Sequence, residues 1–211
     1  MTPPESPSAP PPPPPLVHGD DGLARCGWVR HDSQLTAYHD AEWGVPLHGD
    51  AALFEKLSLE GFQSGLSWLV VLRKREGFRS AFAGFDPRVL AGYGDEDVER
   101  LVADPGIIRN RLKIITMLAN ARALAALLDR EGDGALDRLV WSFAAAAREE
   151  HVPAHEPAEV PAQTAVSADL AAALKDVGLR FVGPVTMYAL MQSGGLIDDH
   201  LTGCFRHSAG R

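Results

Sequence analysis

The chain holds only two cysteines, and each has a histidine at a spacing that suits a shared metal ion. Cys26 precedes His39 by thirteen residues, whereas His200 and Cys204 are four positions apart, on one helical face or in one tight turn. Two thiolates and two imidazoles form a complete tetrahedral set for zinc, and one ion held by all four would join the start of the folded region to its end. The long gap between the pairs is not a standard zinc-finger spacing, so spacing alone leaves open two buried thiols beside unrelated histidines.

The composition indicates a soluble globular protein. The 211 residues are 45% hydrophobic and 23% charged, which is ordinary for such proteins. No apolar run approaches the roughly 18 residues of a membrane helix, and Met1 to Leu16 lacks the basic and apolar segments of a signal peptide. We therefore expect a cytoplasmic protein with no membrane partner. The net charge of −8 argues against a nonspecific coat protein for nucleic acids but allows a local basic face.

A proline run, Pro10 to Pro15, marks a segment that favours an extended chain and cannot build a core. We expect a disordered tail over residues 1–22, a helical domain over residues 23–206 and a flexible C-terminus over residues 207–211. No window of the sequence alternates polar and apolar residues over a sustained stretch. The predicted fold class is therefore all-α.

Local signals predict where several helices begin. Asp50 is expected to cap a helix through Leu59, and Asp86 precedes a proline that suits the first helical position. Apolar periodicity predicts one helix over residues 136–147. Ser167 is expected to cap the helix that follows it.

The segment Leu57–Trp68 combines a single charge, Glu60, with glycines and an aromatic residue. Burial would raise the pKa of Glu60 unless hydrogen bonds stabilise its carboxylate. Trp28, Tyr38 and Trp43 supply further flat faces, and a carboxylate beside several aromatic rings suits a flat, electron-poor or cationic ring. Taken one at a time, Glu60 is better explained as an exposed residue at a helix end, and each tryptophan as ordinary core packing.

Two kinds of segment are candidates for phosphate contacts. Residues 179–186 place an apolar residue, a glycine turn and an immediate helix start in the order of a helix-hairpin-helix junction, although an ordinary turn between helices has the same pattern. Seven cations cluster near predicted helix ends, where they either contact phosphates or face solvent. They are Arg73, Lys74, Arg75, Arg79, Arg109, Arg111 and Lys113.

From about Arg25 to Cys204, the chain resembles the bacterial 3-methyladenine DNA glycosylase I (Tag) family of the helix-hairpin-helix superfamily. The resemblance covers most of the chain, in the family's order. It is carried by Arg25-Cys26-Gly27-Trp28, Tyr38-His39-Asp40, Glu42-Trp43-Gly44-Val45-Pro46, Leu59-Glu60-Gly61, Gln63, Gly65-Leu66-Ser67-Trp68, Gly106-Ile107-Ile108-Arg109-Asn110, Trp141-Ser142-Phe143, Phe181-Val182-Gly183 and Asp199-His200.

The resemblance implies a helix-hairpin-helix DNA glycosylase fold whose N- and C-terminal segments are tethered by one structural zinc ion per chain. The zinc ligands that it implies are Cys26, His39, His200 and Cys204. The base pocket that it implies consists of Trp28, Tyr38, Glu60 and Trp68, with Glu60 as the catalytic residue. The DNA contacts that we expect are Gln63, Gly65, Leu66, Gly183 and Thr186.

The implied activity is removal of 3-methyladenine from alkylated double-stranded DNA by hydrolysis of the N-glycosidic bond, without lyase activity, by a monomer. One alternative is a noncatalytic zinc-dependent protein that binds distorted DNA, in which Glu60→Gln would change little. Another alternative makes the metal catalytic, but four protein ligands leave no open position for water.

Two positions depart from what related enzymes lead us to expect. Many helix-hairpin-helix glycosylases carry a catalytic aspartate near the position of Asp198 and Asp199, whereas the Tag family is regarded as working without it. We expect these aspartates to end the helix and to support His200 as a ligand. Leu35 stands where some relatives have an aromatic residue in the pocket wall.

Overall fold

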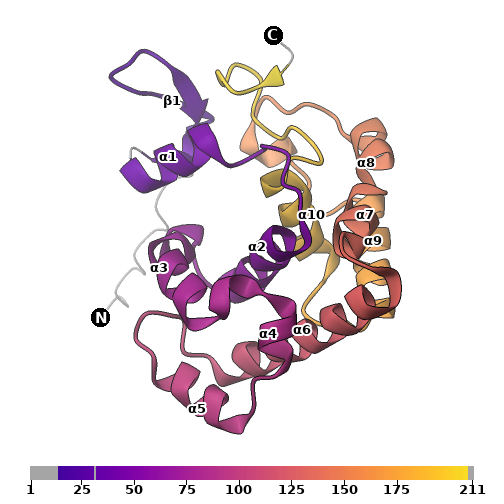
Figure 1. Ribbon diagram of the computed structural model, residues 1–211. Coiled ribbons are helices and arrows are strands. Elements are labelled where there is room, and N and C mark those ends of the chain that lie inside the picture. Colours follow the sequence, from indigo (N-terminus) through magenta and orange to yellow (C-terminus); the bar gives the residue numbers. More distant parts are fainter. Residues whose placement is uncertain (1–13, 31, 209–211) are drawn as a thin grey trace, which may run out of the picture.

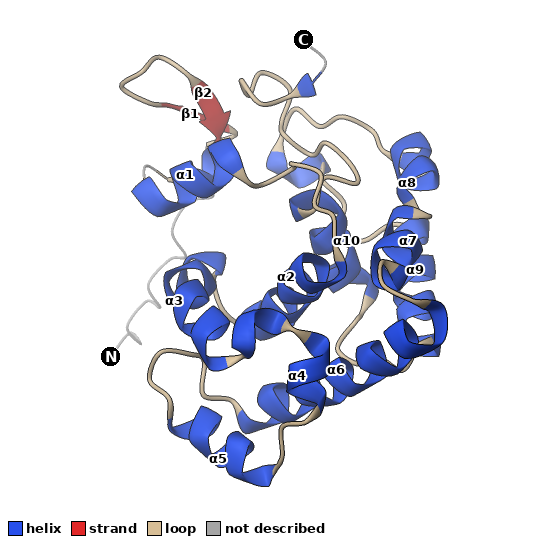
Figure 2. Ribbon diagram, in the orientation of Figure 1, coloured by secondary structure: helices blue, strands red, loops and turns tan. Residues whose placement is uncertain are grey.

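The structure, a computed structural model, describes residues 14–30 and 32–208. Its regular elements are mostly helices, with one antiparallel two-stranded hairpin (Figure 2). The strands are β1 (Leu16–His18) and β2 (Ala24–Cys26). The helices are α1 (Ser33–Ala41), α2 (Asp50–Gln63), α3 (Trp68–Ala81), α4 (Pro87–Ala91), α5 (Asp95–Ala103), α6 (Arg111–Glu131), α7 (Ala135–Trp141), α8 (Ala144–Glu150), α9 (Ala165–Asp176) and α10 (Pro184–Ser193). Short 3-10 helices cover Gly27–Val29, Ala83–Phe85 and Pro157–Glu159.

The predicted all-α class is confirmed apart from the short hairpin, whose three paired positions are too few to show as sequence alternation. The hairpin also places Leu16 in the folded part, before the expected start at Leu23. At the other end, the backbone N–H of Ser208 donates to Asp198. The expected boundaries therefore differ from the structure at both ends, while residues 1–13 and 209–211 lie outside the described residues. No helix within the described ranges is both long and apolar enough to cross a membrane.

Helix α2 is central to the molecule (Figure 1) and packs against α3, α6, α7 and α10. Apolar residues at three- and four-residue steps, such as Leu53, Phe54 and Leu57, give it a buried face. Five buried phenylalanines then form one cluster across α2, α3 and the turn after α3, with ring centroids 4.7 to 6.4 Å apart. This packing holds α2 rigidly.

Hydrogen bonds confirm one of the predicted caps, Asp86, and correct another, Asp50. The Asp86 carboxylate accepts from the first N–H groups of α4, as predicted. Asp50 instead lies within the first turn of α2, and its carboxylate accepts from the backbone N–H groups of residues 134, 136 and 137. Asp50 therefore stabilises the start of α7, which is distant in sequence.

The C-terminal half contains two further corrections. Thr164, not Ser167, is the N-cap of α9, and the two residues form a reciprocal capping box. The single helix expected over residues 136–147 is two helices, α7 and α8, separated at Ser142 and Phe143.

The two ends of the described chain lie side by side (Figure 1). The N–H of Phe205 donates to the carbonyl of Ala24 at 2.9 Å. The N–H of Gly27 donates to the carbonyl of Pro15 at 2.7 Å, and a Cβ at Gly27 would lie only 1.6 Å from the carbonyl oxygen of Pro14. Only glycine at position 27 therefore allows Pro14 and Pro15 to lie this close to the segment that carries Cys26.

Candidate functional site

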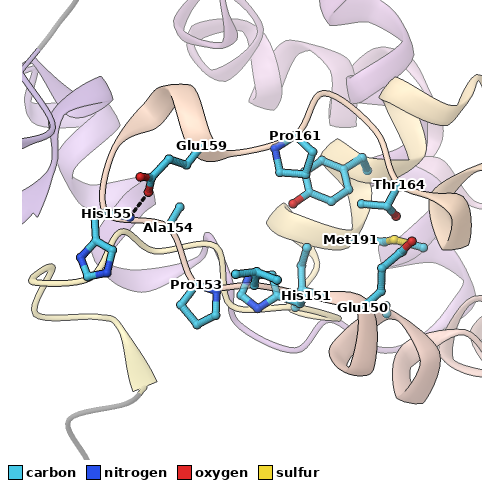
Figure 3. Close-up of a pocket in the computed structure, with 13 residues that line it drawn as sticks. Glu150, His151, Pro153, Ala154, His155, Glu159, Pro161, Thr164 and Met191 are labelled. Atoms are coloured by element: carbon cyan, nitrogen blue, oxygen red, sulfur yellow. Dashed lines mark hydrogen bonds between the residues drawn. The ribbon is translucent and has the colours of Figure 1, made fainter.

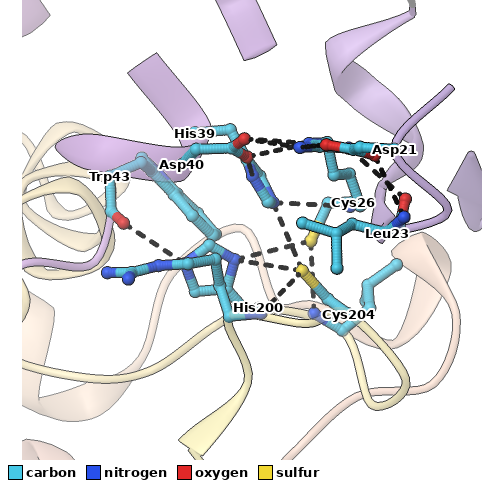
Figure 4. A network of polar contacts seen from close by, with 11 residues as sticks. Asp21, Leu23, Cys26, His39, Asp40, Trp43, His200 and Cys204 are labelled. Atoms are coloured by element: carbon cyan, nitrogen blue, oxygen red, sulfur yellow. Dashed lines mark hydrogen bonds and ion pairs between the residues drawn. The ribbon is translucent and has the colours of Figure 1, made fainter. Parts of the chain in front are cut away.

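The four predicted metal ligands converge in the fold. Cys26, His39, His200 and Cys204 are all buried, and their ligand atoms all lie within 4.8 Å of one another (Figure 4). The S···N distances are 3.3 Å from Cys204 to His39, 3.6 Å from Cys204 to His200 and 3.7 Å from Cys26 to His200. A tetrahedral zinc site, with Zn–S about 2.3 Å and Zn–N about 2.0–2.1 Å, requires S···N of about 3.5 Å. The spacing of these atoms fits a bound metal ion.

Both histidine rings are turned so that one nitrogen faces the cluster and the other is held from outside (Figure 4). His39 Nδ1 lies 2.8 Å from the Asp40 carboxylate, and His200 Nε2 lies 3.2 Å from the carbonyl oxygen of Trp43. Because a carboxylate and a carbonyl only accept, these nitrogens carry the protons. The Nε2 of His39 and the Nδ1 of His200 therefore present lone pairs to the centre of the cluster.

Asp40 is itself held by Arg25, whose guanidinium donates to both of its oxygens and also to Asp21. Arg25 is buried, and these two acids raise its pKa through hydrogen bonds. The arginine thus fixes the carboxylate that orients His39. Support of this kind is typical of structural metal sites.

The charges of the two thiols also fit a cation. The hydrogen bond between them raises the pKa of Cys26, which burial raises further, and lowers the pKa of Cys204. Two buried thiols whose sulfur atoms lie within 4.8 Å of each other do not both become thiolates without a positive counter-charge. A divalent metal ion supplies that charge.

The cluster is in contact with a wall of aromatic rings. The Trp28 ring centroid lies 5.3 Å from that of His39, and the Trp43 centroid lies 4.6 Å from that of His200. Trp28 in turn meets Tyr38 at 6.4 Å and Trp43 at 5.4 Å. The four predicted ligands therefore help to fix the positions of three aromatic side chains.

These aromatic side chains line a cavity of about 620 Å³ between α1, α2, α3 and α10. The structure brings the four side chains predicted for a base pocket to this one cavity, together with Leu35. The cavity is lined by Trp28, Arg30, Leu35, Tyr38, Trp43, Glu60, Gln63, Ser67, Trp68, Leu69, Ala189, Gln192 and Ser193. Its volume suits a single small flat ligand.

Glu60 is the acidic side chain in the wall of this cavity, and only 7% of its surface is exposed. Its Oε1 accepts a hydrogen bond from the Ser193 hydroxyl at 2.9 Å. Burial raises the pKa of Glu60, while the Lys56 charge and the hydrogen bond from Ser193 oppose that rise. Burial, followed by the charge of Glu60, also raises the pKa of Tyr38. Among the described residues that line the cavity, Glu60 is therefore the one carboxylate acceptor, beside several aromatic rings and the Arg30 cation.

The predicted DNA contacts divide between the cavity and its surroundings. Gln63 lines the cavity itself. Gly65 and Leu66 lie in the loop between α2 and α3, where Gly65 has φ +80° and the Leu66 side chain is 42% exposed. The Lys113 ammonium donates to two carbonyl oxygens of this segment, those of Phe62 at 2.8 Å and Ser64 at 2.6 Å. An apolar side chain is thus presented to solvent on a loop that is tied down at its base.

The predicted hairpin connects α9 to α10 and begins α10 at Gly183, its N-cap. The Asn120 side chain both donates to the Arg180 carbonyl and accepts from its N–H, at 2.9 and 2.8 Å. Thr186 lies in the first turn of α10, and the last turn of the same helix reaches the cavity at Ser193. Because α6 carries both Lys113 and Asn120, one helix holds the loop and the hairpin beside each other.

Most of the predicted phosphate-binding cations are engaged within the protein. Four arginines form ion pairs with acids from other segments, and Lys74 donates to a backbone carbonyl. The pairs are Arg73 with Asp32, Arg75 with Glu42, Arg79 with Glu55, and Arg111 with Glu99. These residues are therefore poorer candidates for phosphate contacts than the sequence predicted.

A second cavity, of about 500 Å³, lies on another side of α10 (Figure 3). It is lined by the connector after α8, including His151, and by Tyr188 of α10. His151 Nε2 and the Tyr188 hydroxyl both donate to the Asp199 carboxylate, at 2.7 and 2.6 Å respectively. Asp198 accepts from the N–H of His200 at 3.2 Å. Neither aspartate lines the aromatic cavity. The expectation that they end the helix and support the His200 ring is wrong, because α10 already ends at Ser193 and the His200 ring is held by the Trp43 carbonyl.

Sequence reasoning missed several residues of the site. Trp43 is among the flat faces that the sequence offers beside Glu60, but it is absent from the base pocket that the resemblance implies. Ser193 carries no local signal, because α10 brings it there from far along the chain. Lys56 was also missed, although it lies one helical turn before Glu60 on α2, a spacing at which side chains meet.

Comparisons with known proteins agree with this geometry. The model of the methyladenine glycosylase family matches residues 28–207. DNA-3-methyladenine glycosylase 1 of Escherichia coli is 46% identical over 186 residues, which are 86% of this chain and 96% of that protein. A crystal structure of 3-methyladenine DNA glycosylase I (TAG) superimposes with a TM-score of 0.81 at 46% identity, over 87% of this chain and 99% of that one. A structure of TAG from Staphylococcus aureus, which concerns its recognition of 3-methyladenine, superimposes with a TM-score of 0.77 at 30% identity. The match covers 84% of this chain and 93% of that one.

Proposed function

The chain belongs to the methyladenine glycosylase family, and we propose that it excises 3-methyladenine from alkylated DNA by hydrolysing the N-glycosidic bond. The observation that carries the proposal is the buried carboxylate of Glu60 in the wall of an aromatic cavity of about 620 Å³. Such a cavity suits a flat ring that offers hydrogen-bond donors at its edge.

The chemistry of the lesion matches this cavity. Methylation at N3 makes the adenine base of the nucleotide cationic, so its bond to the sugar is already weak and the base departs as a neutral ring. The enzyme must therefore extract the nucleotide from the duplex and select the base. Glu60 accepts hydrogen bonds from the exocyclic amino group and the ring edge, while Tyr38 and Trp68 stack on the ring. Unmodified adenine gains less because it brings no positive charge to the carboxylate.

We propose hydrolysis without strand cleavage. Cleavage through a Schiff base requires a lysine amine at the sugar carbon. None of the described residues that line the aromatic cavity is a lysine, and the nearby Lys56 donates to Tyr38 from the neighbouring smaller cavity. Water is therefore the nucleophile that we propose.

We propose that the loop at Gly65 and Leu66 fills the gap left by the extracted nucleotide and that the hairpin at Gly183 and Thr186 holds the DNA backbone. Support comes from the exposed, anchored Leu66 side chain and from the helix N-terminus at the hairpin, where backbone N–H groups favour a phosphate. We further propose that the enzyme works as a monomer in the cytoplasm.

We also propose that the buried cluster of two cysteines and two histidines holds one structural zinc ion. Four protein ligands leave no position for a reacting water. The S···N distances from Cys204 to His39 and His200, 3.3 and 3.6 Å, fit tetrahedral coordination of zinc. The ion would supply charge balance for two thiolates and a cross-link between the chain's ends.

The direct test measures the bases that the purified protein releases from methylated duplex DNA. We expect free 3-methyladenine in the supernatant and abasic sites in intact strands. Release of no methylated base from this substrate would overturn the proposed activity. Strand breaks that appear together with the released base would instead overturn the absence of lyase activity.

Leu66→Ala tests the proposed role of the loop. The truncation removes most of an apolar side chain that fills a gap in the base stack, so we expect excision from duplex DNA to fall about tenfold, which corresponds to about 1.4 kcal/mol. Binding of free 3-methyladenine, followed by tryptophan fluorescence, should be unchanged. Val89→Ala is the matched control, because Val89 is 49% exposed on α4 and outside the cavity. Equal excision by the wild type and Leu66→Ala would contradict the role of the loop.

A further inference from the structure

Lys56 occupies a position behind the aromatic wall of the cavity. It lies on α2, one turn before Glu60, and lines a smaller cavity of about 230 Å³ whose wall shares Trp68 and Ser193 with the aromatic cavity. Its side chain is half-buried. A lysine rarely occupies such a place, because burial disfavours the ammonium form unless the surroundings compensate.

The ammonium group meets both rings that we propose to stack on the base. Lys56 Nζ donates to the Tyr38 hydroxyl at 2.9 Å. The same nitrogen lies 4.8 Å from the centroid of the Tyr38 ring and 5.3 Å from that of the Trp68 ring, within cation–π range. The two ring centroids are 5.3 Å apart. One cation therefore links the two rings from the side that faces away from the aromatic cavity.

The other charges near Lys56 already have partners. Glu42 pairs with Arg75, and Glu55 pairs with Arg79. Glu60, by contrast, receives a neutral donor from α10, the Ser193 hydroxyl, and faces the neutral Tyr38 from α1. Arg30 also lines the aromatic cavity, but the charge that lowers the pKa of Glu60 is that of Lys56, one helical turn away on α2.

The pKa directions agree with this pairing. Burial raises the pKa of Glu60, and the charge of Lys56 is the largest influence that opposes the rise. Burial lowers the pKa of Lys56, and Glu60 is the largest influence that opposes this, followed by Glu42. Each group therefore favours the charged form of the other.

We propose that Lys56 is a positioning residue for base recognition, which fixes the Tyr38 and Trp68 rings from behind and keeps Glu60 in its carboxylate form. This inference rests on the proposed function, because it concerns the same cavity. The carboxylate accepts hydrogen bonds from the base, whereas a protonated Glu60 would offer a competing donor. Lys56 touches neither base nor sugar and acts through the residues that do.

The test compares the pH dependence of 3-methyladenine excision in Lys56→Met, Lys56→Arg and the wild type. Methionine keeps most of the length and apolar volume but loses the charge. Side chains four positions apart on a helix are neighbours, and loss of a nearby positive charge raises a carboxyl pKa, so we expect the acidic limb of the Lys56→Met profile to move up by about one pH unit. Lys56→Arg should restore the wild-type limb, and Lys175→Met, on the exposed face of α9, serves as a charge-loss control.

Two further measurements separate this inference from the proposed activity. Carbon-13 NMR of labelled glutamate carboxyls, with Glu60→Gln to assign the signal, reports the Glu60 pKa without any substrate. We expect that pKa to rise in Lys56→Met by the same amount as the acidic limb. In a Glu60→Gln background, Lys56→Met should no longer move the profile of any residual excision.

Two results would overturn the proposal. One is a Glu60 pKa that is the same in Lys56→Met as in the wild type. The other is a loss of excision that is uniform across pH, because that pattern shows a purely structural role. If the wild type released no base while the Glu60 pKa still responded to Lys56, the proposed function would fail but the pairing would stand.

Discussion

Replacing Cys204 by serine is expected to abolish binding of the metal ion that we propose and to lower the free energy of unfolding by about 4 kcal/mol or more. Serine is a poor ligand for a site built from thiolates. Loss of the Cys204 thiolate leaves Cys26 and two buried imidazoles, which are one ligand short of a tetrahedral set. In the chain-entropy model, a cross-link that closes a loop of about 100 residues contributes about 4.7 kcal/mol, and this cluster closes a longer one. That loss is comparable to the whole stability of many domains, about 5–15 kcal/mol.

The measurement combines metal analysis with urea unfolding, in the presence and absence of a chelator. We expect about one metal ion per wild-type chain, none in Cys204→Ser or Cys26→Ser, and a wild type that resembles the variants once chelated. His155→Ala is the control, because this exposed histidine lies in the connector and outside the cluster. A variant that loses all excision but keeps the wild-type unfolding curve would show that the metal acts in catalysis.

The metal prediction also has a consequence for the cavity. The His39 and His200 rings pack against Trp28 and Trp43, with centroids 5.3 and 4.6 Å apart, and both tryptophans line the cavity. Loss of the metal should therefore weaken the binding of free 3-methyladenine under conditions in which the chain is still folded. The cluster, for which we propose a structural role, therefore contacts the wall of the cavity.

The sequence predicted best the features that depend on local order or on the family's motifs. The cap at Asp86 and the helix start directly after the glycine turn at Gly183 follow from neighbouring residues alone, and the structure agrees with them. The spacing of the two cysteine–histidine pairs left a metal cluster open, and the four side chains indeed converge. The four side chains of the predicted base pocket also line one cavity.

The features that could not be predicted depend on partners that are distant in sequence. Asp50 looked like a cap for its own helix, but the fold brings the start of α7 to its carboxylate. Arg75 and Arg79 looked like free cations at a helix end, whereas α2 and the segment after α1 supply acids that pair with them. The contacts of Lys56 could not be predicted, because only the packing of α1 and α3 on α2 places two aromatic rings around it. Periodicity and spacing carry no information about such meetings.

Glu60→Gln is expected to reduce excision of 3-methyladenine by about 10²-fold or more, the range seen when one electrostatic contact to a reacting group is removed. Glutamine keeps the size of the side chain but replaces a carboxylate that only accepts by an amide that also donates. The amide presents no negative charge to the cationic base, and its NH₂ group faces the donors of the base if its oxygen keeps the Ser193 hydrogen bond. Excision from methylated duplex, compared with Glu149→Gln on the exposed end of α8, measures the effect.

The same substitution should not destabilise the protein, and the sign follows from the pKa of Glu60. Burial raises that pKa in the folded state, so folding favours the protonated form. Glu60 therefore supports stability below its unfolded pKa and loses that support as pH rises through its folded pKa. At neutral pH the carboxylate is a cost that glutamine removes, so the unfolding free energy of Glu60→Gln should equal or exceed that of the wild type, with the difference vanishing in acid. Lost excision together with retained or increased stability would assign Glu60 to base recognition, whereas wild-type excision by this variant would show that excision does not depend on the Glu60 carboxylate. A noncatalytic binder of damaged DNA would release no base in either form and would bind DNA equally well with glutamate or glutamine.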